Sequence, residues 1–325
     1  KGYIIEAESL VYVAARVMAG AYNQAGSLVS KGISALGKEF RVGAFINTAT
    51  TNSSPFRYTF LSILATENNT LVEFKDIKTG VTLLNNPSAG NNPASITLNR
   101  GQSYVLATED TSIENKDGLI GALVKSNKPI AINCGSFGGT NGNANNNLDL
   151  GFDQIVPIEN IRSKFTNETK YIFVRGFGLD ITERPLIVAH EDNTEIFINE
   201  VSSKILNAGQ YLAIDGALYG TNGNMYVRTT KPVFAYQSVG GASQPNQEMF
   251  FVPPLNCSTP SIVNNIPLIT EIMPRAFTTS SGVNVVTETG ATLQIAINGN
   301  TYPVSSLPAG VNATLKTVSS NSAFE

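Results

Sequence analysis

The chain has 325 residues, of which 14% are charged, and its formal net charge at pH 7 is -3. This length allows two or three domains, each with its own hydrophobic core. The low charge and the absence of a basic stripe argue against a nucleic-acid partner, and the longest apolar runs are far shorter than a membrane span. The first residue is not Met and the last repeat is cut short, so we expect a fragment of a longer protein.

Short strands joined by many turns are the expected elements along the whole chain. Apolar residues alternate with other residues around 70–74 and 194–198, which is the two-residue period of a strand. The phrases ENNT and EDNT precede these strands, and Asn and Asp favour the backbone geometry of tight turns. The composition therefore predicts an all-β protein.

Self-similarity is the strongest signal in the sequence. Four phrases recur in the same order in two parts of the chain. They are ATENNTLVEF and AHEDNTEIFI, LNRGQSYVLA and LNAGQYLAI, LVKSNKPIAINCGSFGG and YVRTTKPVFAYQSVGG, and FDQIVPIEN and EMFFVPPLN. The extra residues of the first copy fall in polar, Gly-rich or Asn-rich stretches, which are typical of loops.

These repeats predict tandem β-sandwich-like units of about 100 residues each. Residues 1–40 are expected to be the end of a preceding unit plus a junction, and 41–160 the first complete unit. Residues 161–257 are expected to form the second complete unit, and 258–325 a junction and the start of a third, truncated unit.

Short helical junctions are expected between the units. KGISALGKEF places Ile33, Leu36 and Phe40 at helical spacing, and PIENIRSKF does the same with Ile158, Ile161 and Phe165. A related phrase, PLITEIMPRAF, occupies residues 267–277. Such a face would fill the seam between neighbouring units, although an ordinary ordered linker would have the same sequence.

Three phrases carry a family resemblance: AGSLVSKGISALGKEFRVGAF, YIFVRGFGLDITERPLIVAHEDNTEIFIN, and KPVFAYQSVGG with FFVPPLNC. They resemble the N-terminal region of the IgGFc-binding protein family over roughly residues 1–257. That region also occurs in large surface proteins of gliding Bacteroidetes, which are exported by the type IX secretion system.

This resemblance implies a non-enzymatic, secreted or cell-surface binding or adhesion module of a large repeat protein. The expected location is extracellular and associated with the outer membrane. The expected partner is a surface protein or glycan, with components of the type IX secretion system as further partners. No immunoglobulin-binding motif can be transferred residue by residue.

The acidic turns could instead be a site, because Glu67, Glu191 and Glu288 stand at matching places. A catalytic pair of carboxylates needs one constellation with separate roles, whereas copies in every unit favour a structural turn. The single histidine, His190, is replaced by Thr66 in the sister copy, so a Ser-His-Asp mechanism is disfavoured. We interpret His190 as a partly exposed turn residue.

Binding is expected in the long loops of the first complete unit. The candidate residues in those loops are Asn86, Asn91, Asn92, Asn143, Asn145 and Asn147. Asp149 and Asp153 are weak Ca²⁺ candidates, because the spacing of a dedicated calcium loop is missing. No other cofactor is expected.

Cys134 and Cys257 are compatible with one disulfide, which would tie adjacent units together, and also with two buried thiols.

A carbohydrate-binding module or a glycan-active enzyme on a β scaffold is the alternative function. Sugar-binding modules stack sugars on exposed aromatic rings, and the chain has no Trp. Tyr22, Tyr219 and Tyr226 are the tyrosines that could substitute, although the alternation around Tyr226 favours a strand.

Overall fold

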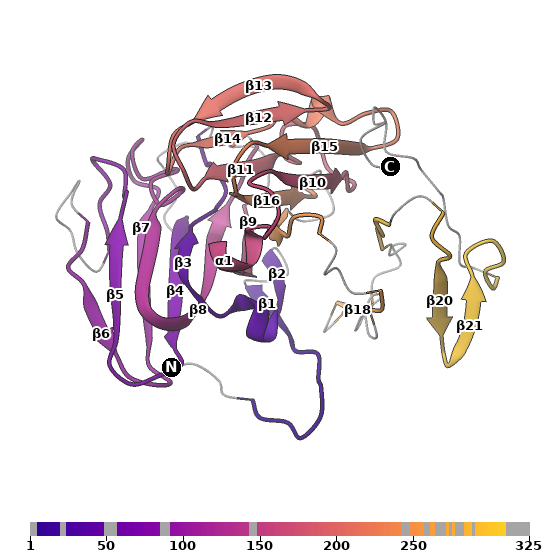
Figure 1. The fold of residues 1–325 in the computed structure, drawn as a ribbon, viewed down its shortest axis with the longest axis horizontal. Coiled ribbons are helices and arrows are strands. Elements are labelled where there is room, and N and C mark those ends of the chain that lie inside the picture. The colour runs from indigo at the N-terminus through magenta and orange to yellow at the C-terminus, as the bar shows by residue number, and fades with distance from the viewer. Residues whose placement is uncertain are drawn as a thin grey trace.

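A computed structural model gives the arrangement of the chain (Figure 1). It describes residues 5–19, 24–48, 57–84, 92–142, 148–241, 247–256, 261–263, 271–272, 275–276, 283–287 and 290–309. The helical elements of these residues are single turns, namely η1 (Gly32–Ala35), α1 (Ile158–Ile161) and η2 (Gly216–Leu218). The predicted all-β class is confirmed.

The first sandwich is a single seven-stranded sheet built around one long strand, β8, whose two parts pair with different strands. The early residues of β8 pair with β3 and β5, and its later residues pair with β4 and β9. The two resulting strand orders are β6-β5-β8-β3 and β7-β4-β8-β9. The bounds are β3 Gly37–Arg41, β4 Tyr58–Ala65, β5 Thr70–Lys75, β6 Ile96–Leu98, β7 Ser103–Glu109, β8 Leu123–Gly139 and β9 Asp149–Ile155.

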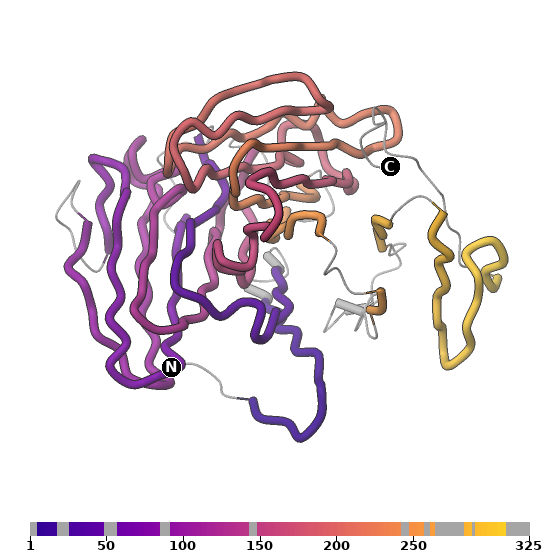
Figure 2. Tube along the Cα trace, viewed as in Figure 1, coloured from indigo at the N-terminus to yellow at the C-terminus, as the bar shows by residue number. Residues whose placement is uncertain are grey.

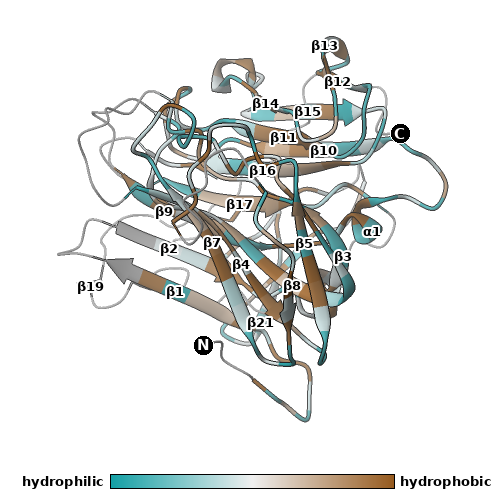
Figure 3. Cartoon of the chain, turned by 90° about the vertical axis from the view of Figure 1, so that its left-hand side faces the viewer, coloured by the Kyte–Doolittle hydropathy of each residue, from teal (hydrophilic) through white to brown (hydrophobic). Residues whose placement is uncertain are grey.

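Alternation of side chains explains why these segments become strands. Buried and partly exposed residues alternate without interruption along β4, so one face of that strand forms the core. Hydrophobic and hydrophilic bands alternate along β5 in Figure 3 as well.

The second sandwich repeats the strand order of the first. Its sheets have the orders β10-β15-β12-β13 and β14-β11-β16-β17, with β15 and β16 in the places of the two parts of β8. The bounds are β10 Thr169–Val174, β11 Pro185–Ala189, β12 Thr194–Ile198, β13 Val201–Leu206, β14 Tyr211–Ala213, β15 Asn224–Thr229, β16 Val233–Val239 and β17 Glu248–Val252.

The sheet β14-β11-β16-β17 joins the two sandwiches, and its central strands β11 and β16 are buried on both faces. On β11, Ile187 packs in the core of the second sandwich, whereas Leu186 and Val188 belong to the core of the first. Phe234 and Tyr236 of β16 also face the first sandwich. The two sandwiches therefore form one continuous packed body. Figure 2 shows the course of the chain through it, from indigo through magenta to orange.

The expected helical junctions are wrong in their details. Only Ile158 and Ile161 bury a helical face, because α1 ends after one turn and Arg162 is already extended. Phe165 is 98% exposed and Ile33 is 86% exposed. Phe40 is buried from strand β3 rather than from a helix, since β3 begins at Gly37. Most of residues 267–277 lie outside the described residues.

Smaller elements flank the two sandwiches. The hairpin of β1 (Ala14–Ala19) and β2 (Gln24–Val29) precedes the first sandwich. The hairpins β18 (Glu271–Ile272) with β19 (Arg275–Ala276), and β20 (Gln294–Ile297) with β21 (Asn300–Pro303), follow the second. The predicted boundary after residue 40 falls inside β3. Within the described parts of the chain, no helix combines the length and apolar character needed to cross a bilayer.

Candidate binding groove between the two sandwiches

The recurring acidic turns are held by the same backbone and hydroxyl bonds in both copies. In the second copy two carboxylates add to these bonds, since Asp192 accepts from the backbone N–H of Ala208 at 2.9 Å and Glu191 pairs with Arg162 at 2.8 Å. The hydroxyl of Thr70 donates to the carbonyl oxygen of Glu67 at 2.8 Å, and Thr194 donates to that of Glu191 at 2.7 Å. In both turns the residue before the threonine is an asparagine with a φ of 55°. Asparagine tolerates this left-handed backbone better than most residues.

The surroundings of the two turns match as well. The backbone N–H of Asn69 donates to the Asn99 side chain, as Asn193 donates to Asn207. Lys128 and Lys231 donate to the carbonyl oxygens of Asn68 and Asp192 at 2.5 and 2.6 Å. Each turn thus closes its own sandwich with the same bonds, and this structural role accounts for the repetition of the acidic phrase.

Arg41 links the first sandwich to the second at the shared seam. Its guanidinium is buried and donates to Asp76 at 2.6 Å, to the carbonyl of Gly121 at 2.8 Å and to the carbonyl of His190 at 3.3 Å. A buried cation needs such partners, because an unpaired charge in the interior is strongly destabilising.

His190 is buried at this seam, so the prediction of a partly exposed turn residue is wrong. Its Nε2 lies 3.4 Å from a carboxylate oxygen of Glu39. Burial, with the nearby Arg41 as a second cause, lowers the pKa of His190 to about 4. The imidazole is therefore neutral at pH 7, and its position between the sandwiches gives it a packing role.

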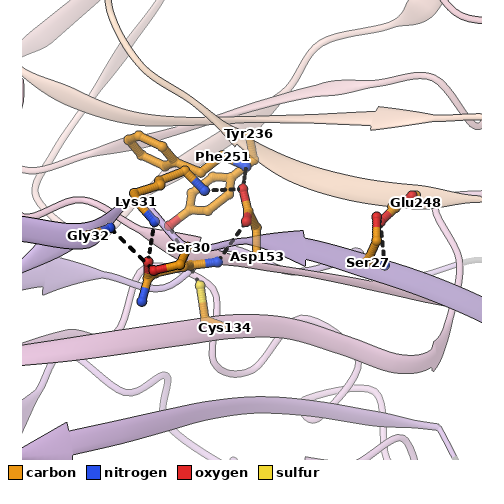
Figure 4. A network of polar contacts seen from close by, with 10 residues as sticks. Ser27, Ser30, Lys31, Gly32, Cys134, Asp153, Tyr236, Glu248 and Phe251 are labelled. Atoms are coloured by element: carbon orange, nitrogen blue, oxygen red, sulfur yellow. Dashed lines mark hydrogen bonds and ion pairs between the residues drawn. The ribbon is translucent and has the colours of Figure 1, made fainter. Parts of the chain in front are cut away.

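A buried polar network connects β9 to the second sandwich (Figure 4). Asp153 accepts from Lys31 Nζ at 2.6 Å and from the backbone N–H of Phe251 at 3.0 Å. Burial raises the pKa of Asp153, and Lys31 opposes that rise. Near it, Ser27 donates to Glu248 through both its N–H and its hydroxyl.

The two calcium candidates do not converge on one point. Asp149 and Asp153 are four residues apart on β9, which separates their Cα atoms by about 13 Å. Asp153 is already paired with Lys31, and Asp149 accepts from the backbone N–H of Gln247 at 2.8 Å. Among the described residues, no group of three His, Cys, Asp or Glu side chains could hold a metal ion.

Cys134 is a buried free thiol. Burial raises its pKa to about 11, so the thiol is protonated at neutral pH. Its sulfur lies 3.8 Å from the hydroxyl of Tyr236. Cys257, its proposed disulfide partner, lies outside the described residues.

Asp149 should make stability depend on pH. Burial raises its pKa from 3.8 to about 6, so folding favours the protonated acid. This stabilisation is complete below pH 4 and is lost as the pH rises through 6. In Asp149→Asn, the free energy of unfolding relative to the parent should increase between pH 4 and pH 6.5, by up to about 3 kcal/mol, and then level off.

Urea unfolding of both proteins across that range measures the difference. His190 has the opposite dependence, because its lowered pKa costs stability below pH 6.5, but it is present in both proteins and cancels. A difference that stays flat with pH would contradict the assignment to Asp149.

An open groove of about 470 Å³ runs along the seam. The first sandwich contributes Asp76, Lys78, Asp117 and Ile120, and the second contributes Lys204, Leu206 and Ala208–Tyr211. Asp117 organises the floor, since it pairs with Lys78 at 2.8 Å and accepts from the Tyr211 hydroxyl. Sequence reasoning missed this groove, because residues from both copies meet only through the shared packing.

Most of the predicted loop residues, namely Asn86, Asn91, Asn143, Asn145 and Asn147, lie outside the described residues. Asn92 is exposed, and its side-chain oxygen accepts from the backbone N–H of Ile77 at 3.0 Å. This bond holds Asn92 next to Ile77, the residue before Lys78. Because Lys78 lines the groove, Asn92 lies close to the groove.

The tyrosines considered for sugar stacking do not form a platform. Tyr226 is fully buried on β15, and Tyr219 is 8% exposed after η2. Tyr22 lies outside the described residues. Neither of the two described rings presents a face to a ligand.

Comparison with known proteins places this architecture in a family. No curated protein matches the sequence. Among solved structures, a serine-rich repeat adhesion glycoprotein of Streptococcus agalactiae is 10% identical, with 69% of this chain and 98% of that chain covered and a TM-score of 0.16. The sequence profile of the IgGFc binding protein family matches residues 25–325, a range that includes both sandwiches and the hairpins after them. The chain therefore belongs to the IgGFc binding protein family.

Proposed function

We propose that this chain is a non-enzymatic binding module of a secreted or cell-surface protein, and that a protein ligand binds in the groove between the two sandwiches. The observation that carries this proposal is the composition of the groove, whose walls come from both sandwiches. Family membership supports a binding role. The acidic turns, which were the best candidates for catalysis, support the fold instead.

The form of the groove favours a segment of a protein over a small molecule. Small-molecule sites are concave and bury most of their ligand, whereas this groove is open to solvent. Lys78 is half exposed beside Asp117, and Lys204 is exposed on the opposite wall. Charged side chains at the rim of an interface steer the partner and fix its orientation.

Reversal of the two groove lysines should therefore weaken binding. We expect Lys78→Glu with Lys204→Glu to reduce affinity for the Fc fragment of immunoglobulin G at least tenfold, measured by surface plasmon resonance with immobilised Fc. The family name makes Fc the first probe. Lys170→Glu with Lys164→Glu, placed away from the groove, is the matched control.

Three results would overturn parts of the proposal. Binding that survives the groove variant but is lost in the control would move the site elsewhere. Absence of Fc binding together with glycan binding on an array would favour the carbohydrate-binding alternative, and glycan hydrolysis that is lost in Glu67→Gln or Glu191→Gln would establish an enzyme.

We also propose export by the type IX secretion system and an association with the outer membrane, as in gliding bacteria. The support is the resemblance of the phrases around residues 25–45 and 171–199 to surface proteins of that kind. Retention of the protein inside a host that lacks this secretion system is the expected result.

A further inference from the structure

The strand β13 is an open edge of the second sandwich. It is six residues long, and in the described part of the chain its one pairing partner is β12. Figure 1 and Figure 3 both show it as the outermost strand of that sandwich. An open edge presents unpaired N–H and C=O groups to which a further strand can bind.

The pairing with β12 shows which backbone groups of β13 are free. Ile205 stands opposite Glu195. The N–H of Glu195 donates to the Thr230 hydroxyl at 3.0 Å, and its carbonyl accepts from the N–H of Thr230 at 3.0 Å, so both groups point away from β13. In an antiparallel ladder the opposite residue then directs its own N–H and C=O outward. Among the described residues, neither group of Ile205 has a hydrogen-bond partner.

Most other sheet edges are short or covered. The edge strands β6 and β14 have three residues each. The edge of β10 is covered by Leu255, whose N–H donates to the carbonyl of Lys170 at 2.8 Å. The edge of β7 is covered by Leu84, whose N–H donates to the carbonyl of Ala107 at 2.9 Å. The edge of β13 is longer than the first two and lacks the cover of the others.

This edge opens onto the groove. Lys204 and Leu206 line the groove, and they stand opposite Ile196 and Thr194, which are buried. Cross-strand partners share a face of the sheet, so Lys204 and Leu206 lie on the face that carries the core of the second sandwich. A strand added beside β13 would therefore direct every second side chain toward the groove.

The charge on β13 defines the partner that suits it. Lys204 is exposed, and no described carboxylate pairs with it. The strand also has a bulge where its register shifts between Ile196 and Phe197 of β12. A lysine and a bulge on an edge strand discourage pairing with an identical edge, because like charges opposite each other are destabilising. A carboxylate opposite Lys204 would be attracted instead.

We infer that the ligand of the groove is an extended polypeptide segment that adds to β13 as a further strand and presents an acidic side chain to Lys204. This inference rests on the proposed function and names the form and charge of the ligand. Backbone bonds to Ile205 supply affinity, and the side chains that enter the groove supply selectivity.

A library of random linear peptides displayed on phage, selected on the immobilised full chain, tests the inference. The enriched peptides should carry Asp or Glu in a run that alternates with apolar residues. A synthetic peptide of an enriched sequence should slow amide hydrogen exchange at Ile205, because its carbonyl groups accept from β13. In Lys204→Glu, the same peptide should bind better when its acidic residue is replaced by lysine.

Ile205→Pro removes the outward N–H and none of the bonds to β12, so the unfolding midpoint should stay close to that of the parent. Peptide binding should weaken by about tenfold or more, as expected for the loss of a backbone hydrogen bond and the exclusion of its neighbours. Ile205→Ala keeps the N–H and is the matched control; it should bind as the parent does.

Strand addition would be refuted by enriched peptides that bind Ile205→Pro as well as they bind the parent, or that leave exchange at Ile205 unchanged. A library that yields no binder would refute it too. Peptides that bind Ile205→Pro but are lost in Lys78→Glu with Lys204→Glu would leave the groove standing as the site. Peptides that bind both of these variants as well as the parent would count against the groove itself.

Discussion

Replacement of Tyr236 by alanine should lower the free energy of unfolding by about 4 kcal/mol, the cost of deleting a large buried aromatic ring. Tyr236 is fully buried and belongs to the core of the first sandwich although it lies on a strand of the second. Its ring packs at right angles to Phe251, with centroids 5.7 Å apart, and covers Gly43. Its hydroxyl donates to the carbonyl of Arg41 at 2.6 Å.

The same variant distinguishes a shared core from independent units. Because Tyr236 stabilises both sandwiches, we expect one cooperative transition in urea, shifted as a whole. Tyr236→Phe is the control; it keeps the ring and loses only the hydrogen bond, at a cost of about 1 kcal/mol. Two transitions, of which only one moves, would show that the sandwiches unfold separately and would contradict the shared core.

Glu183→Ala should cost about 3 kcal/mol or more, because it leaves three backbone N–H groups, one buried and two partly buried, without an acceptor. Glu183 is fully buried at the end of the second sandwich. Its carboxylate accepts from the backbone N–H of Gly176 at 2.5 Å, of Gly240 at 2.9 Å, and of Gly178. Two of these donors lie in the segment after β10, so the carboxylate holds that segment to β16.

Loss of Glu183 should also loosen the segment locally, with faster amide hydrogen exchange across residues 175–182. Glu195→Ala is the matched control, since Glu195 is a partly exposed glutamate whose carboxylate accepts from the hydroxyl of Ser202 at the surface. Its loss should change stability by less than about 0.5 kcal/mol. Equal effects of the two substitutions would contradict a structural role for the buried carboxylate.

Local signals predicted the strands well because they rest on near neighbours in the sequence. Alternation in 70–74 and 194–198 marks β5 and β12, and the turn residues before them occupy the backbone conformation that asparagine favours. The prediction of helical junctions was wrong because it rested on the same kind of local signal. The spacing of Ile33, Leu36 and Phe40 fits a helix, but Phe40 also fits a strand, and pairing of β3 with β8 decides between them.

The candidate site depends on contacts between residues that are far apart in the sequence. His190 looked like a turn residue because its sequence neighbours form a turn, yet Arg41 and Glu39 from the other sandwich enclose it. The groove joins Lys78 and Asp117 to Lys204 and Tyr211, which are far apart along the chain. No periodicity or motif encodes such proximity.

The sequence by itself determined that this protein is all-β, that its phrases repeat, and that it resembles the IgGFc binding family, since each follows from residue order and local backbone preference. Only the tertiary structure decided that β11 and β16 are buried on both faces and that a groove follows the seam. The physical reason is that burial of one sheet between two cores depends on the packing of complete sandwiches, which is a property of surfaces and not of any segment.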